Sequence, residues 1–138
     1  MLSDNLKEFA GKNHNGVLTT FRKSGAGQMS IITCGPVTTG IGFSSTLEKA
    51  KIINLARDNR CTLLISSPDW RQYIVIEGHA KIYHPELSDP KELRLLLRDI
   101  YASASGKDHP NWEEFDRVMV ADRRVGIIVE SENHYSAI

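Results

Sequence analysis

The residues with the clearest chemical potential lie in one stretch, residues 43–54, which combines hydroxyl and amine side chains. Ser44, Ser45 and Thr46 supply hydroxyl groups, and Lys49 and Lys51 follow within two helical turns. A phosphate needs several donors and one or two cations, and a helix start supplies free N–H groups and a favourable dipole. The stretch therefore predicts a phosphate site. Hydroxyls that only cap a helix and lysines that only face solvent would give the same pattern.

The helix that would hold this site is predicted over residues 45–59. Ser45 and Glu48 have the spacing of a capping box, in which a serine begins the helix and a glutamate three residues later closes back on it. The predicted apolar side of this helix carries Leu47, Ala50, Ile53, Leu55 and Ala56.

Two further groups of residues could contact a planar ligand. In the predicted hairpin of strands 16–22 and 28–34, polar side chains could bind the edge of a ring while Phe21 or Met29 lines its face; these polar residues are Thr19, Thr20, Gln28 and Ser30. An aromatic and cationic group stands at the entrance of the strand that begins near residue 73, and its members are Trp70, Arg71 and Tyr73. An ordinary barrel wall and a dimer interface would explain the two groups equally well.

The sequence carries no pattern typical of a metal site or of a known hydrolase motif. None of the five histidines has a second histidine four residues away or a Cys-x-x-Cys partner, so we predict no metal. No Gly-x-Ser-x-Gly elbow and no glycine-rich phosphate loop are present. A Ser-His-Asp or Cys-His triad stays open, because these residue types are common.

Composition limits the classes of partner. The 138 residues include 17 Lys and Arg and 17 Asp and Glu, and this net charge of zero argues against nucleic acid or anionic membranes as partners. No apolar run is long enough to span a membrane, and the polar start does not resemble a signal peptide. Cys34 and Cys61 lie in apolar segments and are expected to be buried and reduced. We therefore expect a cytoplasmic protein.

The remaining pattern predicts one α+β domain over residues 1–138. A short helix near residue 4 precedes six strands, predicted at 16–22, 28–34, 41–44, 61–66, 73–83 and 125–130. Helices are predicted at 91–104 and 111–121 between the last two strands. Because most strands follow one another without a helical crossover, the sheet is expected to be an antiparallel barrel.

The order of these motifs resembles a known family. GVLTT, QMS, FSST-x-x-x-x-K-x-x-N-L and W-x-x-Y-x-x-x-E-G-x-A occur in this order in the flavin-binding split barrels related to pyridoxamine 5′-phosphate oxidase. The later run from Ile100 to Val125 is similar to the subgroup that depends on the deazaflavin coenzyme F420. The resemblance covers essentially the whole chain. It implies a six-stranded antiparallel split β-barrel with peripheral helices, a homodimer, and F420 or FMN bound between the two subunits.

The resemblance also assigns residues to the cofactor. Lys51 would bind its phosphate with Lys49 alongside, Ser44, Ser45 and Thr46 would donate hydrogen bonds, and Asn54 would support the helix. Gln28 and Ser30 would contact the polar edge of the ring, with Thr19 and Thr20 as weaker candidates. Trp70, Arg71 and Tyr73 would lie near the cleft and come from the second subunit.

The implied function is an oxidoreductase that transfers a hydride between F420 or FMN and a small organic substrate of unknown identity. No proton donor follows from the sequence, and Tyr73 and His134 are the only guesses. Two alternatives remain: a flavin or F420 carrier without catalysis, and a haem-binding relative that uses His134. The turn at Gly25-Ala26-Gly27 departs from the family's Gly-x-Pro, and no arginine-bearing C-terminal extension follows, so a true pyridoxamine phosphate oxidase is not expected.

Overall fold

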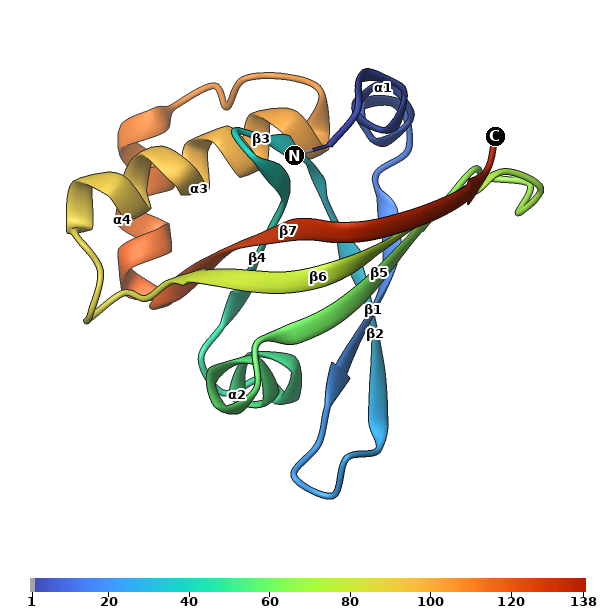
Figure 1. Ribbon diagram of the computed structural model, residues 1–138. Coiled ribbons are helices and arrows are strands. Elements are labelled where there is room, and N and C mark those ends of the chain that lie inside the picture. Colours follow the sequence, from blue (N-terminus) through green and yellow to red (C-terminus); the bar gives the residue numbers. More distant parts are fainter. Residues whose placement is uncertain (1) are drawn as a thin grey trace.

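The computed structural model describes residues 2–138, and a single antiparallel sheet forms its centre (Figure 1). Seven strands pair in the order β2-β1-β5-β6-β7-β4-β3. The strands are β1 (Asn15–Phe21), β2 (Gly27–Thr33), β3 (Gly35–Val37), β4 (Gly40–Thr46), β5 (Arg60–Ser66), β6 (Tyr73–Tyr83) and β7 (Arg124–Ala137).

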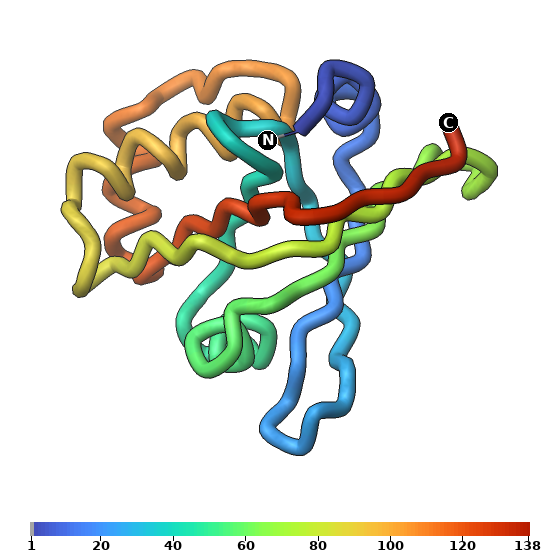
Figure 2. The backbone as a smooth tube through the Cα atoms, viewed as in Figure 1, coloured from blue at the N-terminus to red at the C-terminus, as the bar shows by residue number. Residues whose placement is uncertain are grey.

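The two edges of this sheet lie next to each other in the chain, and this forces the sheet to curl. The edge strand β2 ends at Thr33 and the opposite edge strand β3 begins at Gly35, so one residue, Cys34, joins the two edges. The curled sheet is visible in the backbone trace, where the β1–β2 hairpin projects beyond it (Figure 2). The predicted α+β split barrel is confirmed, with seven strands instead of six, because the three-residue β3 was too short to predict.

Four helices surround the barrel: α1 (Asp4–Lys12), α2 (Ala50–Arg57), α3 (Pro90–Ser105) and α4 (Trp112–Ala121). Helices α1 and α2 lie at opposite ends of the barrel (Figure 1). Leu6 of α1 and Leu55 of α2 belong to the same hydrophobic core as the inward side chains of the strands. The two helices therefore close the barrel ends and exclude water from its interior.

The barrel interior is filled by aliphatic side chains that alternate along the strands with outward residues. Leu18, Leu63 and Ile76 are fully buried there. Cys34 and Cys61 are free and buried in the same core, as predicted, and burial raises the pKa of each thiol to about 12.

Helix α3 packs on the outer face of the sheet, over β3, β4 and β7. Its buried side chains follow the i, i+3, i+4, i+7 spacing of an amphipathic helix and are Leu93, Leu96, Leu97 and Ile100. The helix approaches closely because the sheet has glycines beneath it: a side chain at Gly42 would collide with Ile100, and one at Gly126 with Leu96. Because α3 lies so close to the sheet, α3 and α4 cover the small residues of this part of the sheet.

The last strand differs from its prediction. We predicted residues 125–130, whereas β7 continues to Ala137 and pairs with all of β6 from Tyr73 to Tyr83. Its first half also pairs with β4, where Ser44 lies opposite Gly126 and Thr46 opposite Arg124. The residues after Glu130 are mostly polar, so their composition did not predict a strand. They form one because they pair with β6.

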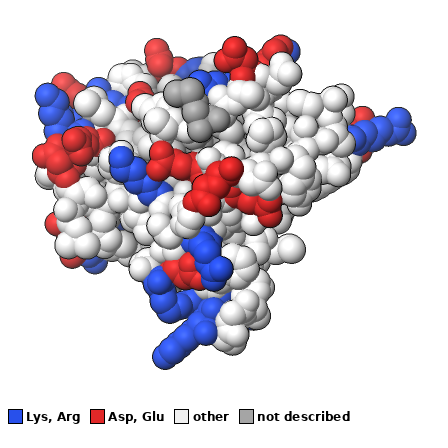
Figure 3. Space-filling view, viewed as in Figure 1, with Lys and Arg blue, Asp and Glu red and all other residues white. Residues whose placement is uncertain are grey.

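Charge is unevenly distributed on this neutral chain. Basic side chains gather at the end of the molecule formed by α2 and the β1–β2 hairpin, whereas acidic side chains lie over the middle of the same face (Figure 3). Among residues 2–138 there is no cluster of His, Cys, Asp and Glu that could hold a metal ion. Nor does this part of the chain contain a helix both long and apolar enough to cross a membrane.

Candidate functional site

Three cations converge where β4 leads into α2. Burial, followed by repulsion from Lys49 and from Arg124, lowers the pKa of Lys51. Within residues 2–138, none of the three forms an ion pair. The acid Glu48 lies beside them, and its pKa is lowered by the hydrogen bond from the Thr46 hydroxyl (2.6 Å) and by Lys49 and Arg124. An excess of positive charge therefore remains, which favours a bound anion.

The hydroxyl residues do not begin the helix as we predicted. Ser44, Ser45 and Thr46 belong to β4, and α2 begins only at Ala50, after Lys49, which has no side-chain cap. The capping box between Ser45 and Glu48 is therefore wrong. Pairing with β7 holds these hydroxyl residues in the extended conformation, so they do not form the first turn of a helix with its free N–H groups.

The strand conformation also divides the hydroxyls between two faces. Ser45 points into the barrel and is buried, whereas Ser44 and Thr46 lie on the outer face with Arg124. The predicted apolar side of α2 changes in the same way, because the helix buries Ile52 and leaves Ile53 exposed. Leu47, which we placed on this apolar side, precedes the helix.

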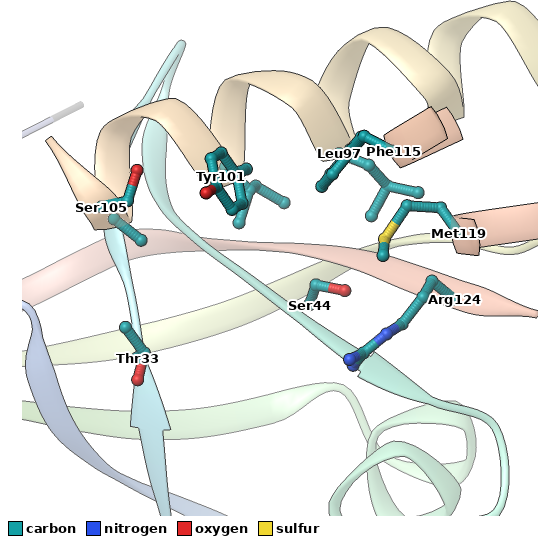
Figure 4. A pocket seen from close by; sticks show the side chains of 10 residues that line it. Thr33, Ser44, Leu97, Tyr101, Ser105, Phe115, Met119 and Arg124 are labelled. Atoms are coloured by element: carbon teal, nitrogen blue, oxygen red, sulfur yellow. The ribbon is translucent and has the colours of Figure 1, made fainter. Parts of the chain in front are cut away.

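A cavity of about 270 Å³ lies between the outer face of the sheet and the two helices α3 and α4. Figure 4 shows Ser44, Arg124 and Thr33 on the sheet side, and Leu97, Tyr101, Phe115 and Met119 on the helix side. One wall is thus apolar and aromatic, and the opposite wall carries hydrogen-bonding groups. We call this space the sheet–helix cavity.

Two buried polar atoms in the sheet–helix cavity have no hydrogen-bond partner among residues 2–138: the Ser44 hydroxyl oxygen and Nε of Arg124. An unsatisfied buried donor costs about 1–3 kcal/mol, and nearly all such groups in proteins are paired. Both groups can donate, so a ligand with oxygen acceptors would satisfy them. The donor set fits the phosphate or carbonyl oxygens of a flavin-type cofactor.

A hydrogen-bond network ties α2 to the first two strands. The buried Asn54 donates from Nδ2 to the Thr20 hydroxyl (3.1 Å) and to Oε1 of Gln28 (2.9 Å). Arg57 donates to Oδ1 of Asn54 (3.1 Å) and to the Phe21 carbonyl (2.7 Å). These contacts fix α2, and with it Lys51, relative to the β1–β2 hairpin.

The structure does not bring the other predicted ring contacts to the sheet–helix cavity. Gln28 and Ser30 lie on the α2 side of β2, whereas Thr33, which lines the cavity, lies on the opposite face of that strand. Thr19 shares the outer face with the cavity but does not line it. His134 is exposed near the end of β7 and is also absent from the lining.

Trp70 and Arg71 lie in the loop between β5 and β6, also away from this cavity. The loop is held by the Ser67 hydroxyl, which donates to Asp69 (2.7 Å) and accepts from the Gln72 amide (3.1 Å). Trp70 has a φ of 63°, in the left-handed region that costs a non-glycine residue about 1 kcal/mol or more. The residue is 72% exposed. Tyr73 follows, half-buried at the start of β6.

Sequence reasoning missed several residues of the cavity, chiefly Arg124, Tyr101, Phe115 and Met119. All four lie in the run from Ile100 to Val125 that suggested the F420 subgroup, and that run was the available signal. These residues line the cavity only because α3 and α4 fold back over β4. A local sequence pattern does not reveal that packing.

The sequence matches the family described as pyridoxamine 5′-phosphate oxidase over residues 2–129. A conserved hypothetical protein from Mycobacterium tuberculosis has a similar structure, with a TM-score of 0.80 and 19% identity over 99% of this chain and 84% of that one. A putative pyridoxamine 5′-phosphate oxidase from Listeria innocua gives 0.67 and 18% over 96% and 95%. An F420 reductase gives 0.65 and 18% over 97% and 98%. At these identities the structures show a shared fold.

Proposed function

Because the chain belongs to the pyridoxamine 5′-phosphate oxidase family, we propose that it binds F420 or FMN and acts as an oxidoreductase on a small organic substrate. The observation that carries this proposal is the position of Arg124, which adds its charge to those of Lys49 and Lys51 and also lines the sheet–helix cavity. There its Nε and the Ser44 hydroxyl are buried without a hydrogen-bond partner among residues 2–138. One of the similar structures, the F420 reductase, makes F420 a reasonable first choice. The bound cofactor would supply the hydride-transfer chemistry.

The residues of the chain divide into two tasks. Lys51, Lys49 and Arg124 would hold the phosphate, with the Thr46 hydroxyl alongside. Donors at the inner end of the cavity, the Ser44 hydroxyl and the Arg124 Nε–H, would stabilise negative charge on an oxygen acceptor. The wall formed by Tyr101, Phe115 and Met119 would exclude water and accept an apolar or aromatic substrate.

The size of the sheet–helix cavity argues for a second subunit. Ligand sites usually measure roughly 300–1,000 Å³, and 270 Å³ is too little for a tricyclic cofactor together with a substrate. Thr33 lines the cavity, and Ile31, two residues earlier, faces the same side of β2. The cavity therefore adjoins the open part of the outer face, where Ile31 lies. A second copy of the chain on that open part would complete the site.

An apolar row crosses the open face at this point. Each of five neighbouring strands contributes one residue to this row, and paired strands place these residues side by side: Ile31 of β2, Val17 of β1, Leu64 of β5, Val75 of β6 and Tyr135 of β7. Ile31 is 80% exposed and Tyr135 53%, a large apolar surface for an isolated chain. We call this the apolar row and propose it as the homodimer contact. The rigid β5–β6 loop would bring Trp70 and Arg71 of the second copy toward the cofactor.

The test is a fluorescence titration of the apoprotein with F420 and, separately, with FMN. Saturable binding of one cofactor is expected. Lys51→Ala should weaken it by about 1.5–3 kcal/mol, roughly ten- to a hundredfold, as for a lost hydrogen bond to a charged group. Lys91→Ala, which removes the same charge from an exposed position on α3, should not change it. Equal affinities for both variants would contradict the phosphate assignment.

Turnover separates an enzyme from a carrier. The protein is loaded with reduced cofactor and mixed with a panel of conjugated carbonyl and quinone acceptors, and reoxidation is followed by absorbance. Reoxidation faster than that of the free cofactor supports the oxidoreductase. Tight binding without acceleration by any acceptor would favour the carrier.

A further inference from the structure

A second cavity, of about 300 Å³, lies between α3 and α4 near the turn that leads into β7. Leu97, Met119 and Arg124 line both this space and the sheet–helix cavity, so they form the wall between the two. Pro90 and Val120 lie on the wall away from the sheet–helix cavity. We call this space the interhelical cavity. Most of its surface is apolar, with charged groups at the rim.

The rim has more positive charge than its own acids neutralise. Glu86 pairs with Arg123, which joins the loop before α3 to the turn after α4. Asp116 accepts from Nε of Arg98 (2.9 Å) and from its Nη2, so each of its carboxylate oxygens is hydrogen-bonded to Arg98. Arg94, also at the rim, forms no ion pair within residues 2–138.

Arg124 adds a second unoccupied donor. Its Nε is buried and has no hydrogen-bond partner in the described part of the chain, and its side chain lines both cavities. The interhelical cavity therefore combines an apolar body with two arginines that form no ion pair among residues 2–138.

We propose that the interhelical cavity is a second ligand site, which binds a small monocarboxylic acid with an apolar body. Apolar groups of the acid would replace water against Leu93, Met119 and Val120. Its carboxylate would accept hydrogen bonds from Arg94 and Arg124. A volume of about 300 Å³ admits a compact acid of one ring, and the apolar walls would leave the extra charge of a phosphate poorly solvated. The interhelical cavity shares Arg124 with the proposed cofactor site, so the two sites are tested separately, this one in the apoprotein.

The test uses 3-phenylpropanoate as the probe and the apoprotein without cofactor. In NMR titrations, saturable shifts are expected for the methyl groups of Leu93, Met119 and Val120 and for the Nε–H of Arg124. The neutral analogue 3-phenylpropanamide should bind roughly tenfold more weakly, because it cannot form the charged hydrogen bonds. The absence of shifts, equal affinity for the amide, or shifts confined to Thr33, Ser44 and Tyr101 would each overturn the proposal.

Matched variants locate the site. Val120→Trp, at an exposed position of the cavity wall, should abolish binding, whereas Val118→Trp on the same helix outside the cavity should not. Arg94→Gln should weaken binding about fivefold, the scale of a partly exposed ion pair, and the equal charge loss of Arg117→Gln should not. Equal effects within either pair, in variants whose spectra show an intact fold, would overturn the assignment.

Discussion

The barrel interior and the outer face of the same sheet are built on different principles. Inside, side chains such as Leu63 and Ile76 are fully buried, and the polar Thr20 and Asn54 are hydrogen-bonded to each other. Outside, Ser44 and Arg124 have buried donors that find no partner in the described part of the chain, and Ile31 is 80% exposed. The groups of the interior find their contacts within the chain. The outer face has polar and apolar groups whose contacts another molecule would have to supply.

This difference indicates where stability and function reside. A group whose contacts are complete in the single chain contributes to folding, and its loss leaves a void. A group without contacts contributes little to folding but gains most when a ligand or subunit arrives. Substitutions on the two faces should therefore separate the two properties.

The largest effect is expected in the interior. Ile76→Ala should lower the free energy of unfolding by about 2–5 kcal/mol, because it removes a fully buried side chain and leaves a cavity. Met29→Ala on the exposed face of β2 should change it by less than about 0.5 kcal/mol. Urea unfolding followed by circular dichroism measures both. Similar losses for the two variants would remove the distinction between the faces.

An intermediate effect is expected at the apolar row. Ile31→Glu should weaken self-association by about 1.5–3 kcal/mol, the value of one isoleucine withdrawn from an interface, while the fold stays intact. Sedimentation or light scattering over a concentration series gives the dissociation constant. Ile53→Glu, the same change at an exposed position of α2, is the control. A wild-type protein that is monomeric throughout would refute the dimer proposal itself.

The smallest effect on stability is expected at Ser44. Because its hydroxyl has no partner, Ser44→Ala should leave the free energy of unfolding within about 1 kcal/mol of wild type or raise it slightly. The same variant should weaken binding of cofactor or substrate, measured by the titration used for Lys51. A clear loss of stability would show that the hydroxyl already serves the folded chain.

Much of the fold could be predicted from local patterns. The long strand over residues 73–83, the helix of Leu93, Leu96, Leu97 and Ile100, and the two buried cysteines were all confirmed. Each has a strong periodicity or an apolar environment within a few residues. Predictions failed where pairing with a distant strand decided the conformation, as at Ser45 and in the second half of β7, and where a strand was too short to leave a pattern, as in β3.

The candidate site was less predictable than the fold. Lys49 and Lys51 were found from residue type and spacing, but Arg124 joins them only because β7 pairs with β4. Gln28 was predicted to contact a ring, yet its side-chain oxygen is already bound to Asn54. Residue type indicates what a side chain can do, whereas the face on which it lies decides what it meets.

The sequence by itself determined the type of protein: an α+β chain, an apolar barrel interior, reduced cysteines and a lysine-bearing helix. These properties follow from burial and backbone preferences that act over a few neighbouring residues. Only the tertiary structure decided that Ser44 faces outward with Arg124, and that α3 and α4 enclose two cavities sharing one arginine. Strand register and helix packing join residues far apart in the chain, and no local pattern records which of them will meet.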